Sequence, residues 1–104
     1  MKTVQVEMLA FGEKGLFREV EIPTSYPHQG NTEEILEATF RFGQNDFQPI
    51  ADRASVSVGD VIWLDVEKWL VKMAGFKKLD EASYIGYSNL AQRDRNFVAM
   101  GFDD

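Results

Sequence analysis

The chain has no cysteine, one histidine and three prolines among its 104 residues. The lack of cysteine excludes disulfide bonds and thiolate metal sites, and it makes a reducing compartment the expected setting. No stretch has the ~20 consecutive apolar residues that span a bilayer, and the first twenty residues lack an apolar run of signal-peptide length. We therefore expect a cytoplasmic protein without membrane contact.

Positive charge is also scarce, since 11 basic residues face 17 acidic ones and the formal net charge is -6. Tight binding to a phosphate backbone needs a basic surface, so this balance argues against nucleic-acid binding as the main activity. We interpret the acidity as a contribution to solubility. The length predicts a single domain over residues 1–104 that is large enough to bury a core.

Residues suited to catalysis are sparse. His28 lies between Pro27 and Gln29 in an expected surface loop, and without a second histidine or a cysteine it is a poor metal ligand. Asp60 follows Gly59, where an aspartate side chain readily accepts hydrogen bonds from nearby backbone amides. We predict no catalytic residue, no metal, no cofactor and no enzymatic activity.

The central stretch is residues 55–76, which holds both tryptophans and the longest apolar runs. Two runs rich in Val, Ile, Leu and Trp flank a short polar connection, which predicts a β-hairpin. A turn on residues 66–67, or a wider one with the same pairing, sets Leu64 opposite Trp69. One face then carries Ile62, Leu64, Trp69 and Val71, and the other carries Val61, Trp63, Leu70 and Lys72. Both faces are mostly apolar, so other parts of the chain should cover both.

A second hairpin is predicted near the N-terminus, because residues 3–10 and 16–22 both alternate polar and apolar side chains. An odd loop or a bulge between them would set Val6 opposite Val20 or Ile22, so that the apolar faces match.

A helix is predicted over about residues 32–42. Asn31 and Glu34 have the spacing of a capping box, and Gly43 is a suitable residue for the helix end. The fold class that follows is α+β, with a small, mostly antiparallel sheet of two or more hairpins and this one main covering helix.

After Asp80 the pattern weakens. It predicts a short strand near residues 84–87, a helical turn over 90–95 and a last strand over 97–100, with glycine and asparagine interrupting each run. We expect residues 80–104 to be less ordered than the rest.

The same region holds a candidate interaction group of Tyr84, Tyr87, Arg93 and Arg95. Aromatic rings beside positive charge suit single-stranded nucleic acid or an acidic partner. The alternative is an ordinary solvated C-terminal segment.

Residues 53–62 read Arg-Ala-Ser-Val-Ser-Val-Gly-Asp-Val-Ile, and Gly75-Phe76 follow the hairpin. This pattern, with the helix before it, resembles the signature of the YodL-like domains, small modules of bacterial chromosomes, phages and plasmid-borne polyvalent proteins. The residues that carry the resemblance are Arg53, Ser55, Ser57, Gly59, Asp60, Gly75 and Phe76. The Val-Gly-Asp segment is also similar to the strand start of small β-barrels of the ASCH and PUA kind. Neither resemblance implies catalytic residues.

Two functions remain open from the sequence. The leading hypothesis is a non-enzymatic module that binds a protein partner in a phage- or plasmid-associated setting, as the YodL-like resemblance implies. The alternative is a small barrel-like domain that binds single-stranded nucleic acid through the aromatic and arginine residues near the C-terminus.

Overall fold

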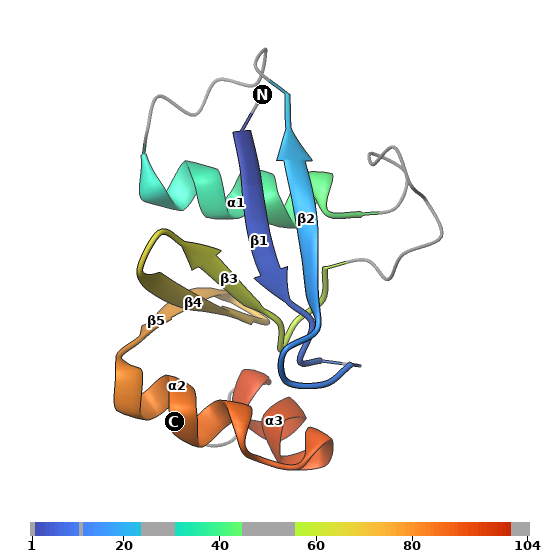
Figure 1. Ribbon diagram of the computed structural model, residues 1–104, viewed down its shortest axis with the longest axis vertical. Coiled ribbons are helices and arrows are strands. Elements are labelled where there is room, and N and C mark those ends of the chain that lie inside the picture. The colour runs from blue at the N-terminus through green and yellow to red at the C-terminus, as the bar shows by residue number, and fades with distance from the viewer. Residues whose placement is uncertain (1, 11, 24–30, 45–55, 101–104) are drawn as a thin grey trace.

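An antiparallel sheet of five strands forms the centre of the molecule (Figure 1). The computed structural model describes residues 2–10, 12–23, 31–44 and 56–100. The strands are β1 (Lys2–Glu7), β2 (Phe17–Ile22), β3 (Val61–Leu64), β4 (Glu67–Lys72) and β5 (Gly75–Leu79). Their order in the sheet is β2-β1-β3-β4-β5. The described strands therefore form an open sheet with β2 and β5 at its edges, rather than a barrel.

Helices cover both faces of this sheet. They are α1 (Thr32–Phe42), α2 (Glu81–Ser88) and α3 (Gln92–Ala99). Figure 1 shows α1 behind β1 and β2. The helices α2 and α3 lie together below β3, β4 and β5, on the side of these strands that is away from α1. The predicted α+β class is confirmed, with two more helices than the sequence pattern indicated.

The helix α1 has the predicted bounds and the predicted N-cap. The side chain of Asn31 accepts a hydrogen bond from the Glu34 backbone N–H at 3.3 Å, which satisfies one of the free amides of the first turn. The helix ends at Gly43, but this glycine has an ordinary right-handed conformation with φ at -76°. A Cβ at this position would collide with Val56 and lie 2.7 Å from the Thr39 carbonyl oxygen. Close packing, not a left-handed turn, therefore requires glycine here.

The core has two layers, one on each side of the sheet. On the α1 side the buried residues include Val4, Val6, Val20, Ile22, Leu36, Ile62 and Val71, with Leu64 and Trp69 packed against them. On the other side they are Leu9, Val61, Leu70, Leu79, Tyr84 and Tyr87, with Trp63 among the partly buried residues. The prediction that the central hairpin is apolar on both faces is confirmed, and each face contributes to one layer of the core.

The register of that hairpin differs from the predicted one. Leu64 pairs with Glu67 and not with Trp69, so only Asp65 and Val66 connect the two strands. Asp65 has φ of 55°, a conformation that aspartate tolerates better than most residues and that tight hairpin turns require. The difference is a shift of two residues, which leaves every side chain on its predicted face.

The N-terminal hairpin shows a similar shift. Val6 pairs with Arg18, so the prediction that it lies opposite Val20 or Ile22 is wrong. Residues 8–16 join the two strands. The connection has an odd number of residues, as predicted. It is longer than the gap between the predicted strands, which end at residue 10 and begin again at residue 16. The register again changes by an even number of residues and preserves the faces.

The C-terminal region forms helices instead of the two predicted strands. Residues 84–87 lie in α2 and residues 97–100 lie in or directly after α3, which also contains most of the predicted helical turn. Asp80 caps α2, since its side chain accepts a hydrogen bond from the Ser83 N–H at 2.7 Å. The buried residues of α2 have helical spacing, which the short apolar run of 84–87 did not show.

Candidate functional site

The sheet splits between its first and third strands. β1 and β3 pair through Glu7 and Val61, Val6 and Ile62, and Gln5 and Trp63, and the pairing ends there. Figure 1 shows the two strands diverging from this point toward the hairpin turn. The start of β1 and the β3–β4 turn therefore border a gap, and α1 lies behind it.

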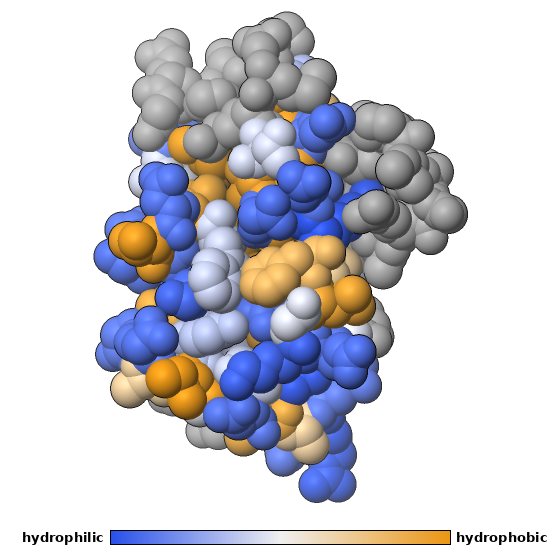
Figure 2. Space-filling model, viewed as in Figure 1, coloured by the Kyte–Doolittle hydropathy of each residue, from blue (hydrophilic) through white to orange (hydrophobic). Residues whose placement is uncertain are grey.

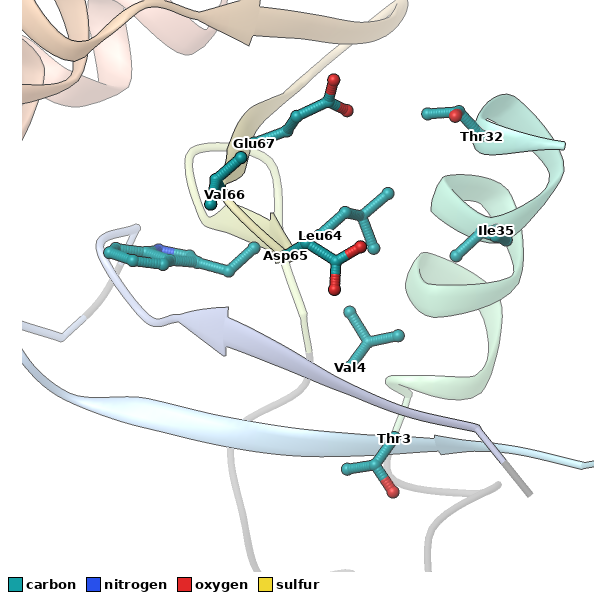
Figure 3. Close-up of a pocket in the computed structure, with 9 residues that line it drawn as sticks. Thr3, Val4, Thr32, Ile35, Leu64, Asp65, Val66 and Glu67 are labelled. Carbon is teal, nitrogen blue, oxygen red and sulfur yellow. The ribbon is translucent and has the colours of Figure 1, made fainter. Parts of the chain in front are cut away.

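This gap holds a cavity of about 510 Å³, which we call the hairpin cleft (Figure 3). It is lined by Thr3, Val4, Thr32, Ile35, Trp63, Leu64, Asp65, Val66 and Glu67. Three separate elements contribute these residues, namely β1, the N-terminal half of α1 and the β3–β4 hairpin.

The hairpin cleft has aliphatic side chains at its base and a polar rim, and the polar groups supply most of its exposed lining. Figure 3 shows Leu64 and Ile35 facing one another across the cavity, with Val4 directed toward them from β1. The Asp65 carboxylate points into the space between the hairpin and Val4. Val66 at the turn is 87% exposed, which is unusual for a valine and leaves apolar surface uncovered beside the cavity.

The two carboxylates of the hairpin cleft differ in their hydrogen bonding. Glu67 accepts hydrogen bonds from Lys78 Nζ at 3.0 Å and from Trp69 Nε1 at 3.3 Å. These two contacts lower the pKa of Glu67, so it stays ionised with its partners inside the chain. The Asp65 carboxylate has no hydrogen-bond partner or ion pair among the residues that the structure describes.

A second cavity of about 310 Å³ lies next to the hairpin cleft along α1. Its lining residues are Thr32, Glu33, Leu36, Trp69 and Phe76, and Thr32 borders both cavities. The reason for this opening is that α1 packs mainly on β2, at the far edge of the sheet from β4 and β5. The α1-facing side of the central hairpin is thus only partly covered.

Two of the predicted interaction residues, Tyr84 and Tyr87, lie in the interior. The hydroxyl of Tyr84 donates to Glu7 Oε1 at 2.6 Å, and the hydroxyl of Tyr87 donates to the Gly59 carbonyl oxygen at 2.5 Å. Burial is the main cause that raises the pKa of both tyrosines. Their rings are therefore unavailable for stacking on a nucleic-acid base.

The two predicted arginines also lie apart. Arg95 is buried, with Nε donating to the Leu9 carbonyl oxygen at 3.0 Å and Nη1 donating to that of Leu90 at 2.6 Å. Arg93 alone of the four residues is at the surface, where 84% of its side chain is exposed. The structure does not bring Tyr84, Tyr87, Arg93 and Arg95 together as an exposed surface.

The signature residues around Asp60 form a buried turn. Oδ1 of Asp60 accepts from the Ala10 N–H and Oδ2 accepts from the Ser57 N–H, both at 2.8 Å. Gly59 has φ of 106°, and a Cβ there would lie 3.2 Å from that of Ala10. Burial raises the pKa of Asp60 to about 6, although the backbone amides act in the opposite direction. Asp60 thus accepts hydrogen bonds from nearby backbone N–H groups, as its place after Gly59 predicts.

The other signature residues have no shared site. Gly75 begins β5 with φ of 92°, and Phe76 packs partly on the α1-side core. Arg53 and Ser55 lie outside the described residues, as does His28. Where the signature is described, its residues shape turns and core.

An aromatic cluster that the sequence did not indicate lies on the other face. Lys68 Nζ is 4.6 Å from the centre of a Trp63 ring and 5.1 Å from that of Tyr84, and it forms an ion pair with Glu81 at 3.2 Å. Phe17 packs edge-on against Trp63. Because the Lys68 ammonium group already lies against the Trp63 and Tyr84 rings, we interpret this cluster as a structural one. Figure 2 shows that the hydrophobic side chains on the viewed side form small separate groups among hydrophilic ones.

The described residues contain no group of three or more His, Cys, Asp or Glu side chains placed to hold a metal ion. Within the same part of the chain, no helix is both long enough and apolar enough to cross a bilayer. Comparisons with protein-family models, with curated proteins and with solved structures found no match. The fold and its cleft thus define a small α+β protein with a split antiparallel sheet, and the resemblance to the YodL-like domains stays a prediction.

The sequence pattern did not point to the hairpin cleft. In the sequence, Asp65 and Glu67 lie at the connection of the predicted central hairpin and Thr3 begins a predicted strand, so no pattern brings the three residues together. The one sequence signal for this site is Val66. Polar residues and glycine dominate hairpin turns, so a valine in this position is unusual.

Proposed function

We propose that this chain is a non-enzymatic interaction module that binds an extended polypeptide segment of a partner protein in the hairpin cleft. The observation that carries the proposal is the split of the sheet, which leaves a cavity of about 510 Å³ at a strand edge, with aliphatic side chains at its base and polar groups around them. Strand edges and apolar pockets together are what peptide-binding domains use, with the main chain supplying affinity and the pockets supplying specificity.

The neighbouring cavity supports a partner of this size. Because both cavities border Thr32, a bound segment can continue from the hairpin cleft along α1 toward Trp69 and Phe76. Those two aromatic side chains are partly buried and face the α1 side of the sheet. Aromatic residues at a partly open groove are frequent anchors of protein interfaces.

Nucleic acid is the less supported ligand. The rim of the hairpin cleft carries Asp65 and Glu67, the net charge is -6, and Tyr84 and Tyr87 are buried. A phosphate backbone would be repelled from this rim and would find no exposed ring of the predicted group to stack on. The alternative hypothesis therefore gains no support from the geometry.

The setting of this interaction follows from the resemblance alone. The pattern of residues 53–62 and of Gly75-Phe76 leads us to propose an accessory protein of a phage, plasmid or chromosomal mobile region. Genes of such elements should neighbour the gene for this chain, and a stable position among housekeeping genes would contradict this part of the proposal.

A random peptide library displayed on phage tests the binding function. Peptides selected on the intact chain should lose at least tenfold in affinity for Val66→Asn, because this change removes exposed apolar surface at the cavity without adding charge. Met73→Asn is the matched control, since Met73 is 68% exposed at the β4–β5 turn, outside both cavities. Both substitutions are at surface turns, where effects on folding are small.

Three outcomes would contradict the proposal. One is that selected peptides bind wild type and Val66→Asn equally. Another is concentration-dependent dimerisation in analytical ultracentrifugation that Val66→Asn abolishes, which would assign the cleft to a second copy of the chain. The third is displacement of the peptides by single-stranded RNA in low salt, which would favour the nucleic-acid alternative.

A further inference from the structure

We infer that the partner segment is basic and that one of its lysine or arginine side chains enters the hairpin cleft, with the cationic group on the Asp65 carboxylate. This inference rests on the proposed function and specifies the chemistry of the partner. Four features of the cleft support it, namely the unpaired carboxylate, the turn that holds it, the aliphatic base and the free strand edge.

The first feature is the difference between the two carboxylates. Glu67 is already bonded to Lys78 and Trp69, whereas Asp65 has neither an ion pair nor a hydrogen bond within the described residues. The Asp65 carboxylate points into the cavity rather than away from the hairpin (Figure 3). A ligand that covered this carboxylate without a positive group would leave a desolvated charge, which is costly. The cleft therefore selects against neutral and acidic segments.

The second feature is the turn itself. Asp65 is the first of only two connecting residues and has φ of 55°, so the backbone holds its side chain at the mouth of the cleft. Asparagine and glycine adopt this conformation at least as readily as aspartate. The turn alone thus does not require an acid at this position, and it leaves the carboxylate available to a ligand.

The third feature is the aliphatic base behind the carboxylate. Val4, Ile35 and Leu64 supply aliphatic surface between Asp65 and the body of the protein. Lysine and arginine have aliphatic stems that pack on such surface while the charged group reaches a polar partner. A cavity with this base and an unpaired carboxylate at the rim matches both parts of a basic side chain.

The fourth feature is the edge of β1. The Met8 N–H donates to the Leu16 carbonyl oxygen on the β2 side. Since successive strand residues direct their backbone groups to opposite sides, Thr3 directs its N–H and C=O toward β3. The pairing with β3 ends at Gln5, so Thr3 has no strand partner across the gap among the described residues. An extended segment in the cleft can pair with this edge.

The charge of the whole chain acts in the same direction. The net charge is -6, and Glu33 lines the neighbouring cavity beside the proposed path of the segment. A basic segment is attracted over a distance of about 10 Å in 0.1 M salt, which raises its association rate. Binding should accordingly weaken as salt concentration rises.

The test uses the peptides that were selected on the intact chain and that lose affinity for Val66→Asn. We expect these to be enriched in Lys and Arg relative to the starting library. For the tightest lysine-containing peptide, replacement of its lysine by acetyl-lysine should raise the Kd about tenfold or more, the usual effect of losing a charge-assisted hydrogen bond. Asp65→Asn should raise the Kd of the unmodified peptide similarly and should remove the effect of acetylation.

Glu37→Gln is the matched control, because it removes one exposed negative charge from α1 without changing either cavity. It should leave the Kd within about twofold at 0.15 M salt, where exposed charges are largely screened. The thermal midpoint of Asp65→Asn should stay close to that of wild type, since asparagine suits the turn. Protection of the Thr3 amide from hydrogen exchange in the complex would support strand pairing at this edge.

The inference and the proposed function can fail separately. Peptides that need Val66 but lack basic residues, or that ignore Asp65→Asn, would overturn the inference and leave the binding function intact. If no selected peptide depends on Val66, the proposed function fails and the inference with it.

Discussion

At the scale of single residues, Asp60 shows how a buried carboxylate can serve structure alone. Its two oxygens each accept a backbone N–H, one from Ser57 in the same turn and one from Ala10, fifty residues earlier. These bonds hold the segment before β3 against the segment after β1. The carboxylate is nevertheless buried deeply enough that its pKa rises to about 6.

The raised pKa of Asp60 predicts a pH dependence of stability. The unfolded chain releases this proton near pH 4 and the folded chain near pH 6, so between these values the folded state binds more protons. The contribution of Asp60 to the free energy of unfolding is therefore full below about pH 4 and is lost as the pH rises through 6. A difference of about two pKa units corresponds to roughly 3 kcal/mol.

Urea unfolding of wild type and Asp60→Asn at several pH values between 4 and 7 checks this. The difference in the free energy of unfolding, wild type minus variant, should decrease by about 2–3 kcal/mol over that range. Asp65→Asn is the control, because Asp65 is exposed. A difference that stays constant or grows with pH would refute the assigned pKa.

At the scale of elements, the junction between α1 and the segment before β3 depends on one glycine. The Gly43 carbonyl oxygen accepts hydrogen bonds from Val56 N–H and from Arg18 Nη1, both at 3.1 Å. The position has no room for a Cβ, as the close approach of Val56 and of the Thr39 carbonyl shows. The helix end is thus fixed by what packs on it.

Two glycine substitutions should have opposite effects. Gly43→Ala should lower the free energy of unfolding by about 1–3 kcal/mol, because the added methyl group overpacks the site. Gly86→Ala in the middle of α2 meets no atom within 4 Å and should raise it by about 0.5–1 kcal/mol, the gain in helix propensity. Chemical denaturation measures both, and a Gly43→Ala variant that is as stable as wild type or more stable would show that the site can accommodate a Cβ.

The elements also show which sequence signals were reliable. Residues 32–42 were predicted as a helix within its observed bounds, because the Asn31 cap and the periodicity are local features. The central hairpin was predicted with correct faces but a register displaced by two residues. The alternation of side chains determines faces, whereas register depends on turn geometry, which here is a two-residue turn with positive φ at Asp65.

At the scale of the whole molecule, the C-terminal helices complete the second layer of the core. Tyr84 of α2 reaches Glu7 of β1 and packs edge-on against Trp63 of β3. Glu7 also accepts the Gly15 N–H at 2.9 Å, so its buried carboxylate is fully engaged. Within the described part of this region, Tyr84, Tyr87 and Ala99 are buried, whereas Ile85 and Phe97 are exposed on the same two helices.

Adjacent residues of α2 offer a test of this arrangement. Tyr84→Ala should lower the free energy of unfolding by about 3 kcal/mol or more, because it removes a buried ring and leaves Glu7 short of a partner. Ile85→Ala should change it by less than about 0.5 kcal/mol, since Ile85 is 47% exposed. Tryptophan fluorescence and circular dichroism should report one common transition, and a separate early transition for the helices would contradict a single cooperative unit.

The sequence by itself determined the features that depend on neighbours along the chain. These are the N-cap of α1, the two apolar faces of the central hairpin and the turn that Asp60 forms with Ser57, since local hydrogen bonds and side-chain periodicity suffice for each. Only the tertiary structure decided the split of the sheet, the hairpin cleft and the burial of Tyr84, Tyr87 and Arg95. These depend on which distant segments meet, and the pairing of β1 with β3 across more than fifty residues leaves no periodic trace in the sequence.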